Sequence, residues 1–142
     1  MKKLGSLIER NEQGEVVEVD FAVVDDFTDA GLVHLKGLTS LQTLNLSGSI
    51  TDAGLVHLKG LTGLQLLWLS QTQITDAGLV HLKGLDKLQT LYLNGISMTD
   101  AGVRHLKELK QLVKLFINAT KLTDAGRAEL KRALPDCMVV YE

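Results

Sequence analysis

The chain has 142 residues, with 15 basic and 17 acidic side chains and a formal net charge of −2 at pH 7. This balance provides no electrostatic attraction toward nucleic acid or an anionic membrane surface, so neither is expected as a partner. A single cysteine excludes an internal disulfide framework, and the lack of any long apolar run makes a cytoplasmic location the default expectation.

The N-terminal segment is predicted to cap a larger structure. Leu4, Leu7 and Ile8 have the spacing of a helix, and residues 11–14 indicate a turn. The stretch VVEVDF at 16–21 then indicates a first strand.

One phrase dominates the rest of the chain. TDAGLVHLKGL occurs at 28–38, 51–61 and 75–85, and altered copies occur at 99–109 and 123–133. Successive copies begin 23, 24, 24 and 24 residues apart. A fixed period in this range is typical of stacked supersecondary units.

The phrase itself predicts a short helix. Thr28 is a candidate N-cap, Asp29 suits the positive end of the helix dipole and Lys36 the negative end, while Gly37 fits a left-handed C′ position. At helical spacing, Leu32 and Leu35 share one face and His34 lies opposite.

A glycine on the flank of that helix predicts a close approach. Gly31 lies on one flank and Val33 on the other. We expect the valine of a neighbouring helix to pack against the glycine.

Short strands are predicted between the helices. Their sequences are LQTLNL at 41–46, LQLLWL at 64–69, LQTLYL at 88–93 and LVKLFI at 112–117. In the second strand, Leu67 and Leu69 point one way and Trp68 the other.

The C-terminal segment, like the N-terminal one, is predicted to be a cap. Pro135 should end the last helix, residues 137–141 should form a final edge strand, and Cys137 should be a small buried hydrophobe. Arg127 replaces a leucine of earlier copies, so its side chain should extend over the end of the core.

The pattern L-x-x-L-x-L, followed by a turn and a helix, resembles the leucine-rich repeat over residues 16–142. The 24-residue length and the TDAG phrase are similar to those of bacterial leucine-rich repeat proteins. Thr72, Ile96 and Thr120 occupy the position where that family often has asparagine, so its buried asparagine ladder should be absent.

The expected fold is an α/β solenoid. Strands stand ~4.8 Å apart, whereas helices need about 8–10 Å, so a parallel sheet should line the concave face and short helices the convex face. Residues 1–142 then form one domain: 1–27 as the N-terminal cap and first strand, 28–122 as four repeats and 123–142 as the C-terminal cap.

The four histidines suggest a metal site, but their spacing argues against one. They occupy one repeat position on neighbouring helices about 8–10 Å apart, whereas a shared Zn²⁺ needs each ring nitrogen about 2.1 Å away. The residues are His34, His57, His81 and His105. We therefore expect a solvated, copied face, with no metal, no cofactor and no catalytic residue; an enzyme using a metal on the helix face is a less favoured hypothesis.

The outward positions of the strands form three columns. The middle column runs Asp20, Asn45, Trp68, Tyr92 and Phe116. The column before it runs Glu18, Thr43, Leu66, Thr90 and Lys114, and the column after it runs Ala22, Ser47, Ser70, Asn94 and Asn118. Three of the six aromatic residues thus fall on consecutive strands.

An aromatic strip with a polar rim is typical of a binding surface. We expect a recognition scaffold that binds a protein or peptide through Trp68, Tyr92, Phe116, Leu66, Thr90, Asn94, Lys114 and Asn118. The family resemblance implies the same role. Two alternatives are a carbohydrate-binding module that uses the same aromatic strip and a structural fragment of a larger solenoid. A monomer or weak homo-oligomer is expected.

Overall fold

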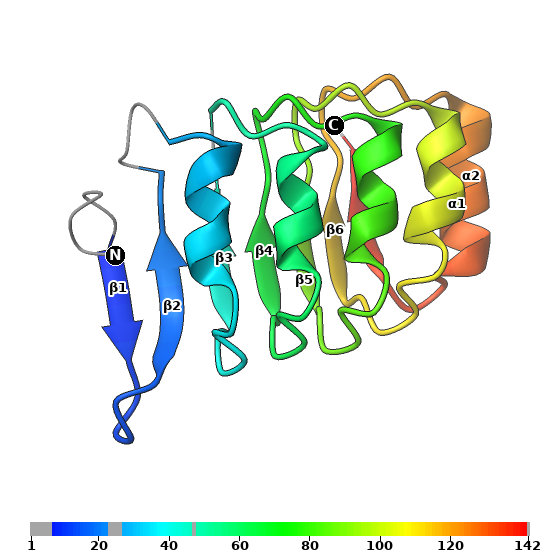
Figure 1. Cartoon of the computed structure of the whole chain (residues 1–142). Coiled ribbons are helices and arrows are strands. Elements are labelled where there is room, and N and C mark those ends of the chain that lie inside the picture. Colours follow the sequence, from blue (N-terminus) through cyan, green and yellow to red (C-terminus); the bar gives the residue numbers. More distant parts are fainter. Residues whose placement is uncertain (1–6, 23–26, 47, 142) are drawn as a thin grey trace.

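The computed structural model describes residues 7–22, 27–46 and 48–141. One seven-stranded sheet runs through this part of the chain, with its strands in sequence order (Figure 1). Strand β1 pairs antiparallel with β2, and every later pair is parallel. The strands are β1 (Leu7–Arg10), β2 (Val16–Asp20), β3 (Thr43–Asn45), β4 (Leu66–Trp68), β5 (Thr90–Tyr92), β6 (Lys114–Phe116) and β7 (Met138–Val140).

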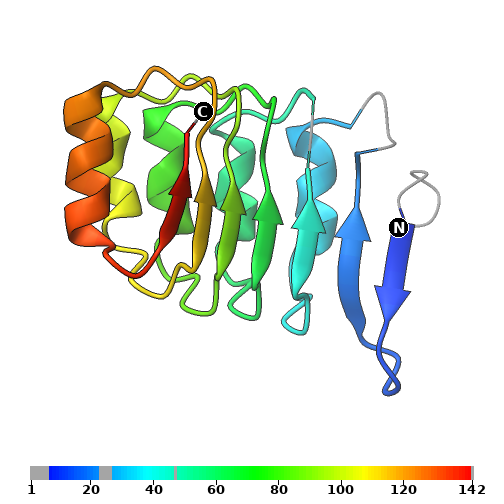
Figure 2. The same ribbon diagram turned by 180° about the vertical axis from the view of Figure 1, so that it is seen from behind.

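Short helices cover one face of the sheet and leave the other free of helices (Figures 1 and 2). They are the 3₁₀ helices η2 (Asp29–Leu35), η3 (Gly54–Leu58), η4 (Asp76–Leu82) and η5 (Asp100–Gly102), followed by α1 (Val103–Leu106) and α2 (Asp124–Ala133). This arrangement confirms the predicted solenoid. We call the helix-free side of the sheet the open face.

The repeated phrase forms mostly 3₁₀ helix, and its leucines lie three residues apart. In a 3₁₀ helix, residues i and i+3 lie one above the other. Leu32 and Leu35 are consequently both fully buried although η2 has only seven residues. Gly37 follows with a φ of +88°, as predicted for the C′ position.

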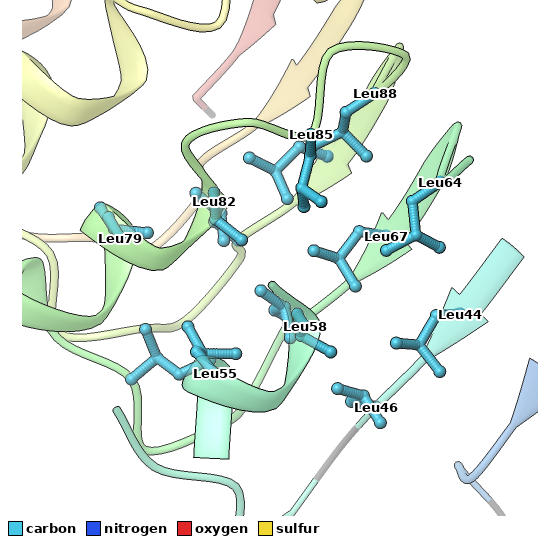
Figure 3. Close-up of a cluster of buried hydrophobic side chains, with 14 of the residues drawn as sticks. Leu44, Leu46, Leu55, Leu58, Leu64, Leu67, Leu79, Leu82, Leu85 and Leu88 are labelled. Carbon is cyan, nitrogen blue, oxygen red and sulfur yellow. The ribbon is translucent and has the colours of Figure 1, made fainter. Parts of the chain in front are cut away.

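The core lies between the sheet and the helices and consists mainly of leucine (Figure 3). Leu44 on β3 and Leu67 on β4 point toward Leu55 and Leu58 of η3. All four are completely buried. Each unit covers the leucines of the next, because no single unit encloses its own.

The helical interpretation of the N-terminus is wrong for the part that the structure describes. Leu7–Arg10 is strand β1, and it forms a hairpin with β2. The Asn11 side-chain oxygen accepts hydrogen bonds from the amides of Gln13 and Glu15, and Gly14 has a φ of +83°, which confirms the turn. This turn folds the chain back, so pairing with β2 prevails over the helical spacing. Leu4 lies outside the described residues.

The predicted N-cap bond is absent at Thr28 and Thr75, whereas Thr99 and Thr123 do accept a bond from their own helices. Whether or not they cap their own helix, the threonines of the second to fifth copies bind to the aspartate of the preceding copy. The Thr51 amide donates to Asp29 Oδ1 over 2.8 Å and its hydroxyl donates to Oδ2 over 2.5 Å. The same pair of bonds recurs from Thr75 to Asp52, Thr99 to Asp76 and Thr123 to Asp100. We call this series the Thr–Asp ladder.

The ladder also explains the glycine of the phrase. A methyl group on Gly54 would overlap the Asp29 carboxylate, and one on Gly78 would overlap that of Asp52. The valine predicted to pack there does not: Val33 and Val56 are 47% and 43% exposed. A carboxylate thus fills the space that the sequence pattern assigned to valine.

The turn after the strand uses threonine where the family often has asparagine. The Thr72 hydroxyl donates to the Leu69 carbonyl over 2.7 Å, and the Thr120 hydroxyl donates to the Ile117 carbonyl over 2.9 Å. Ile96, at the same position, is buried in the core.

An arginine and a tyrosine lie against each other near the C-terminal end of the solenoid. Helix α2 ends at Ala133, two residues before Pro135. The Arg127 guanidinium lies 5.1 Å from the Tyr141 ring centroid and donates to Asp124 over 2.7 Å, which agrees with its predicted position over the end. Cys137 is buried, as expected, and burial raises the pKa of its thiol.

Candidate binding face

The open face has the first two side-chain columns that the sequence predicts, whereas Ser47 of the third column lies outside the described residues. Asn45, Trp68, Tyr92 and Phe116 are aligned in register on neighbouring strands, and Val140 on β7 continues the column. Leu67, between two outward residues, is completely buried, whereas Trp68 is 38% exposed. The predicted strand register is therefore confirmed.

Three aromatic rings form a continuous stack along the middle column. The Trp68 and Tyr92 ring centroids are 3.8 Å apart with an interplanar angle of 8°. Those of Tyr92 and Phe116 are 4.4 Å apart with an angle of 5°. Their position on adjacent strands brings the rings together, because the strand spacing of ~4.8 Å is close to the distance between stacked rings.

Stacking determines which parts of the rings a ligand can reach. Both faces of Tyr92 are covered by its neighbours, since it stacks on Trp68 and on Phe116. The stack therefore presents ring edges along its length and a ring face only at its two ends. Ring edges carry partial positive charge, which favours contact with carbonyl oxygens and with aromatic faces placed edge-on.

Polar residues flank the stack. Thr90 and Lys114 lie beside it in the column that also contains Leu66, and that column continues to Met138. Asn94 also contributes to the framework, because its Oδ1 accepts a hydrogen bond from the Asn118 amide over 2.8 Å. The Ser70 hydroxyl accepts one from the Asn94 amide in the same way.

An acidic group lies at the N-terminal end of the open face. Glu18 and Asp20 occupy β2, and the hairpin pairs Glu9 on β1 with Glu18. Glu9 did not enter the sequence-based site, because its segment was expected to be helical. The signals that would have placed it are the turn at 11–14 and the possibility of pairing with the next strand.

The apolar surface extends further toward β7 than the sequence indicated. Met138 is 59% exposed beside Lys114, and Val140 lies beside Phe116. The contribution of these two residues depends on the register of β7, which the sequence left open. The aromatic stack thus continues into an aliphatic surface.

Two hollows border the N-terminal hairpin, both lined by Glu15, Thr39 and Ser40. Hydrogen bonds from Asn11 and from Ser40 lower the pKa of the Glu15 carboxyl. The hollows lie away from the aromatic stack, and we place the candidate site on the open face.

The histidines lie on the outer helices, as predicted. His34 is exposed and the other three are half-buried. Among residues 7–22, 27–46 and 48–141, no group of three or more His, Cys, Asp or Glu side chains is arranged to hold a metal ion. No helix in this part of the chain is long and apolar enough to cross a membrane.

The 24-residue unit, the parallel sheet and the leucine core define this chain as a leucine-rich repeat protein. Solved structures with the same fold include internalin C2 of Listeria monocytogenes, with a TM-score of 0.61 and 30% sequence identity. That match covers 76% of this chain and 45% of internalin C2. An internalin F from the same organism has a TM-score of 0.63 and 26% identity, covering 77% of this chain and 30% of that one.

A more distant match shows the fold alone. The structure of PEPR1–AtPEP1 has a TM-score of 0.52 and 17% identity, over 94% of this chain and 22% of that one. The chain spans less than half the length of either internalin. No family model matches the sequence, and a search of the curated proteins finds no match.

Proposed function

We propose that this chain is a non-enzymatic recognition scaffold whose open face binds a protein or peptide. The single observation that supports this most is the stack of Trp68, which is exposed, with the half-buried Tyr92 and Phe116 on the face that no helix covers. Large aromatic side chains are the residues most enriched among binding hot spots. Leucine-rich repeat proteins, including the internalin-like folds, commonly serve as protein-interaction modules.

The distribution of variable positions supports the same proposal. The helical phrase is copied nearly unchanged, whereas the open face carries a different set of side chains on each strand. Folding requires the buried leucines but does not require exposed aromatic residues, which add a risk of aggregation. Leu66, Thr90, Asn94, Lys114 and Asn118 would then supply contacts around the aromatic centre.

The ring geometry favours a peptide over a sugar. A sugar ring packs against an aromatic face, and stacking leaves such a face only at the Trp68 and Phe116 ends, whereas ring edges run along the whole stack. The edges that remain suit backbone carbonyls and aromatic side chains, which a protein or peptide provides.

A capture experiment with matched variants tests the proposal. Immobilised wild-type chain is compared with a Trp68→Ala/Tyr92→Ala variant and with a His57→Gln/His81→Gln variant altered only on the helices. We expect at least one protein to be retained by wild type and by the histidine variant but lost from the aromatic variant. Equal retention by all three folded chains would overturn the proposal.

A further inference from the structure

The two faces of the Trp68 indole lie in different surroundings. Tyr92 covers one face at 3.8 Å. The other face is directed toward β3, where the residue in register is Asn45, whose side chain is much smaller. Because Trp68 is the end member of the stack, it is the ring that offers an indole face as well as an edge.

Carboxylates lie on the second strand from Trp68 on that side, β2. Asp20 pairs in register with Asn45, and Glu18 occupies the neighbouring column of β2. Strand β2 is two strand spacings, ~10 Å, from Trp68. The Ala22 amide donates to Asp20 Oδ1, which leaves Oδ2 for another donor, and no ion pair between described residues involves Asp20, Glu18 or Glu9.

The cation in the open-face columns lies far from these carboxylates. Lys114 is on β6, four strand spacings or ~19 Å from β2. Physiological salt screens charges beyond about 8 Å, so Lys114 does not neutralise the acidic group. The open face therefore carries the carboxylates of Glu9, Glu18 and Asp20 at β1 and β2, with Leu7 beside Asp20. It continues through the indole face to an aromatic and aliphatic column at β5 to β7, which Thr90 and Lys114 flank.

We propose that the open face recognises a peptide segment through an arginine side chain, whose guanidinium stacks on the part of the Trp68 indole face that the smaller Asn45 leaves exposed and pairs with Asp20 and Glu18. A guanidinium within ~6 Å of the indole centroid lies over β3, about one strand spacing from the carboxylates on β2. Its planar form allows stacking and paired hydrogen bonds at the same time, which a lysine ammonium does not.

The spacing of the strands also predicts how far from the arginine the peptide carries its second contact residue. From β3 to Phe116 on β6 the distance is three strand spacings, ~14 Å, which an extended chain covers in about four residues. We therefore expect an apolar or aromatic residue two to four positions from the arginine, lying against the ring edges. This inference rests on the proposed function and specifies the partner that the same face takes.

A selection from a random library of twelve-residue peptides displayed on phage tests the inference. Wild-type chain is immobilised, and soluble Trp68→Ala/Tyr92→Ala chain is added as competitor to remove peptides that bind elsewhere. We expect the retained peptides to share an arginine with an apolar residue two to four positions away. A selection that retains no peptide, or peptides without a shared arginine, contradicts the inference.

Two substitutions then test the pairing on one retained peptide, with Trp68 fluorescence as the readout because it is the only tryptophan. Changing the peptide arginine to lysine should weaken binding at least threefold. Glu18→Gln/Asp20→Asn in the protein should weaken binding of the arginine peptide at least threefold. The same protein variant should bind a peptide with glutamine in place of the arginine as tightly as wild type does. Asn at position 20 keeps the Oδ1 that accepts the Ala22 amide, and circular dichroism checks the fold.

The matched control is Asp86→Asn/Asp136→Asn, which removes two exposed carboxylates away from the open face and should leave binding unchanged. A second result is that peptide binding is lost in the Trp68→Ala/Tyr92→Ala chain but unchanged by replacing the peptide arginine or the pair Glu18 and Asp20. That result overturns this inference and still agrees with the proposed function. Peptides that bind the Trp68→Ala/Tyr92→Ala chain as tightly as wild type count against both.

Discussion

The Thr–Asp ladder and the open face of this solenoid come from the same repeat, but the ladder residues are the same in every copy and the open-face residues differ. Along the ladder, every junction between copies uses the same residues, an aspartate that receives two hydrogen bonds from the next threonine. Across the open face, neighbouring strands present a carboxylate, an amide and then aromatic rings in one column. Residues that repeat hold the units in register, whereas residues that vary are free to serve binding.

The contrast has a geometric cause. At the ladder, the carboxylate occupies the space above a glycine, so neither residue can change without moving the other. On the open face, the aromatic side chains project from the sheet and stack on their neighbours in the column. A substitution at the ladder should therefore affect stability, and a substitution on the open face should mainly affect binding.

The largest expected effect separates the buried side of a strand from its open side. Leu67→Ala should lower the free energy of unfolding by about 2–5 kcal/mol, because the leucine is completely buried and leaves a cavity. Trp68→Ala should cost clearly less, since the ring is partly exposed and packs on one neighbouring ring. Urea denaturation of both variants measures this difference. A larger loss for Trp68→Ala would contradict the distinction between the two sides.

The next effect concerns the ladder. Gly78→Ala adds a methyl group that overlaps the Asp52 carboxylate. The overpacking should cost about 1–3 kcal/mol, more than the gain of up to ~1 kcal/mol from replacing glycine in a helix. Denaturation of Asp52→Ala and of the double variant completes a cycle. We expect the double variant to lose less free energy of unfolding than the two single variants lose together. If the single losses add within ~0.5 kcal/mol, the two groups do not collide.

A smaller effect is the dependence of the ladder on pH. Hydrogen bonds from the hydroxyl and amide of Thr123 lower the pKa of Asp100 below its ordinary value of 3.8. A lowered folded-state pKa means that this carboxylate stabilises the fold above 3.8, and that the contribution is lost as the pH falls through the folded value.

Asp100→Asn removes the acceptor for the Thr123 hydroxyl, so it should destabilise the chain at pH 7. Because the contribution of Asp100 disappears in acid, wild type and variant should converge below pH 3.8. Denaturation from pH 7 to pH 2.5 follows both curves, with Asp86→Asn as the exposed control. If wild type and variant differ in free energy of unfolding by the same amount at every pH, the ladder hydrogen bond does not depend on the charge of Asp100.

The smallest effect is expected on the outer helices. Replacing His34, His57, His81 and His105 with glutamine should leave the melting temperature nearly unchanged at pH 7, since the rings do not enter the core. Zn²⁺ should not stabilise wild type. A rise in melting temperature with Zn²⁺ that disappears in the glutamine variant would identify a functional surface on the helices.

Much of this fold could be predicted because the repeat states the same information several times. The alternation of Leu67, Trp68 and Leu69 determines the strand register, and the constant period then places Tyr92 and Phe116 beside Trp68. No single position carries the prediction, so errors in one copy are corrected by the others.

Contacts between copies were harder to predict. Asp29 fits a helix N-terminus by itself, and nothing in one copy shows that its carboxylate reaches Thr51 in the next. Likewise, the strand character of Leu7–Arg10 depends on pairing with β2 rather than on local spacing. Because Glu9 was thus misplaced, the acidic end of the open face was underestimated.

The measurement that tests the central claim most directly is the affinity of a partner from the capture experiment for wild type and for the Trp68→Ala/Tyr92→Ala chain. Isothermal titration calorimetry gives the Kd, and circular dichroism confirms that both chains are folded. We expect at least ~30-fold weaker binding to the variant, the loss of a hot spot worth about 2 kcal/mol. An unchanged Kd with the fold intact would contradict recognition by the open face.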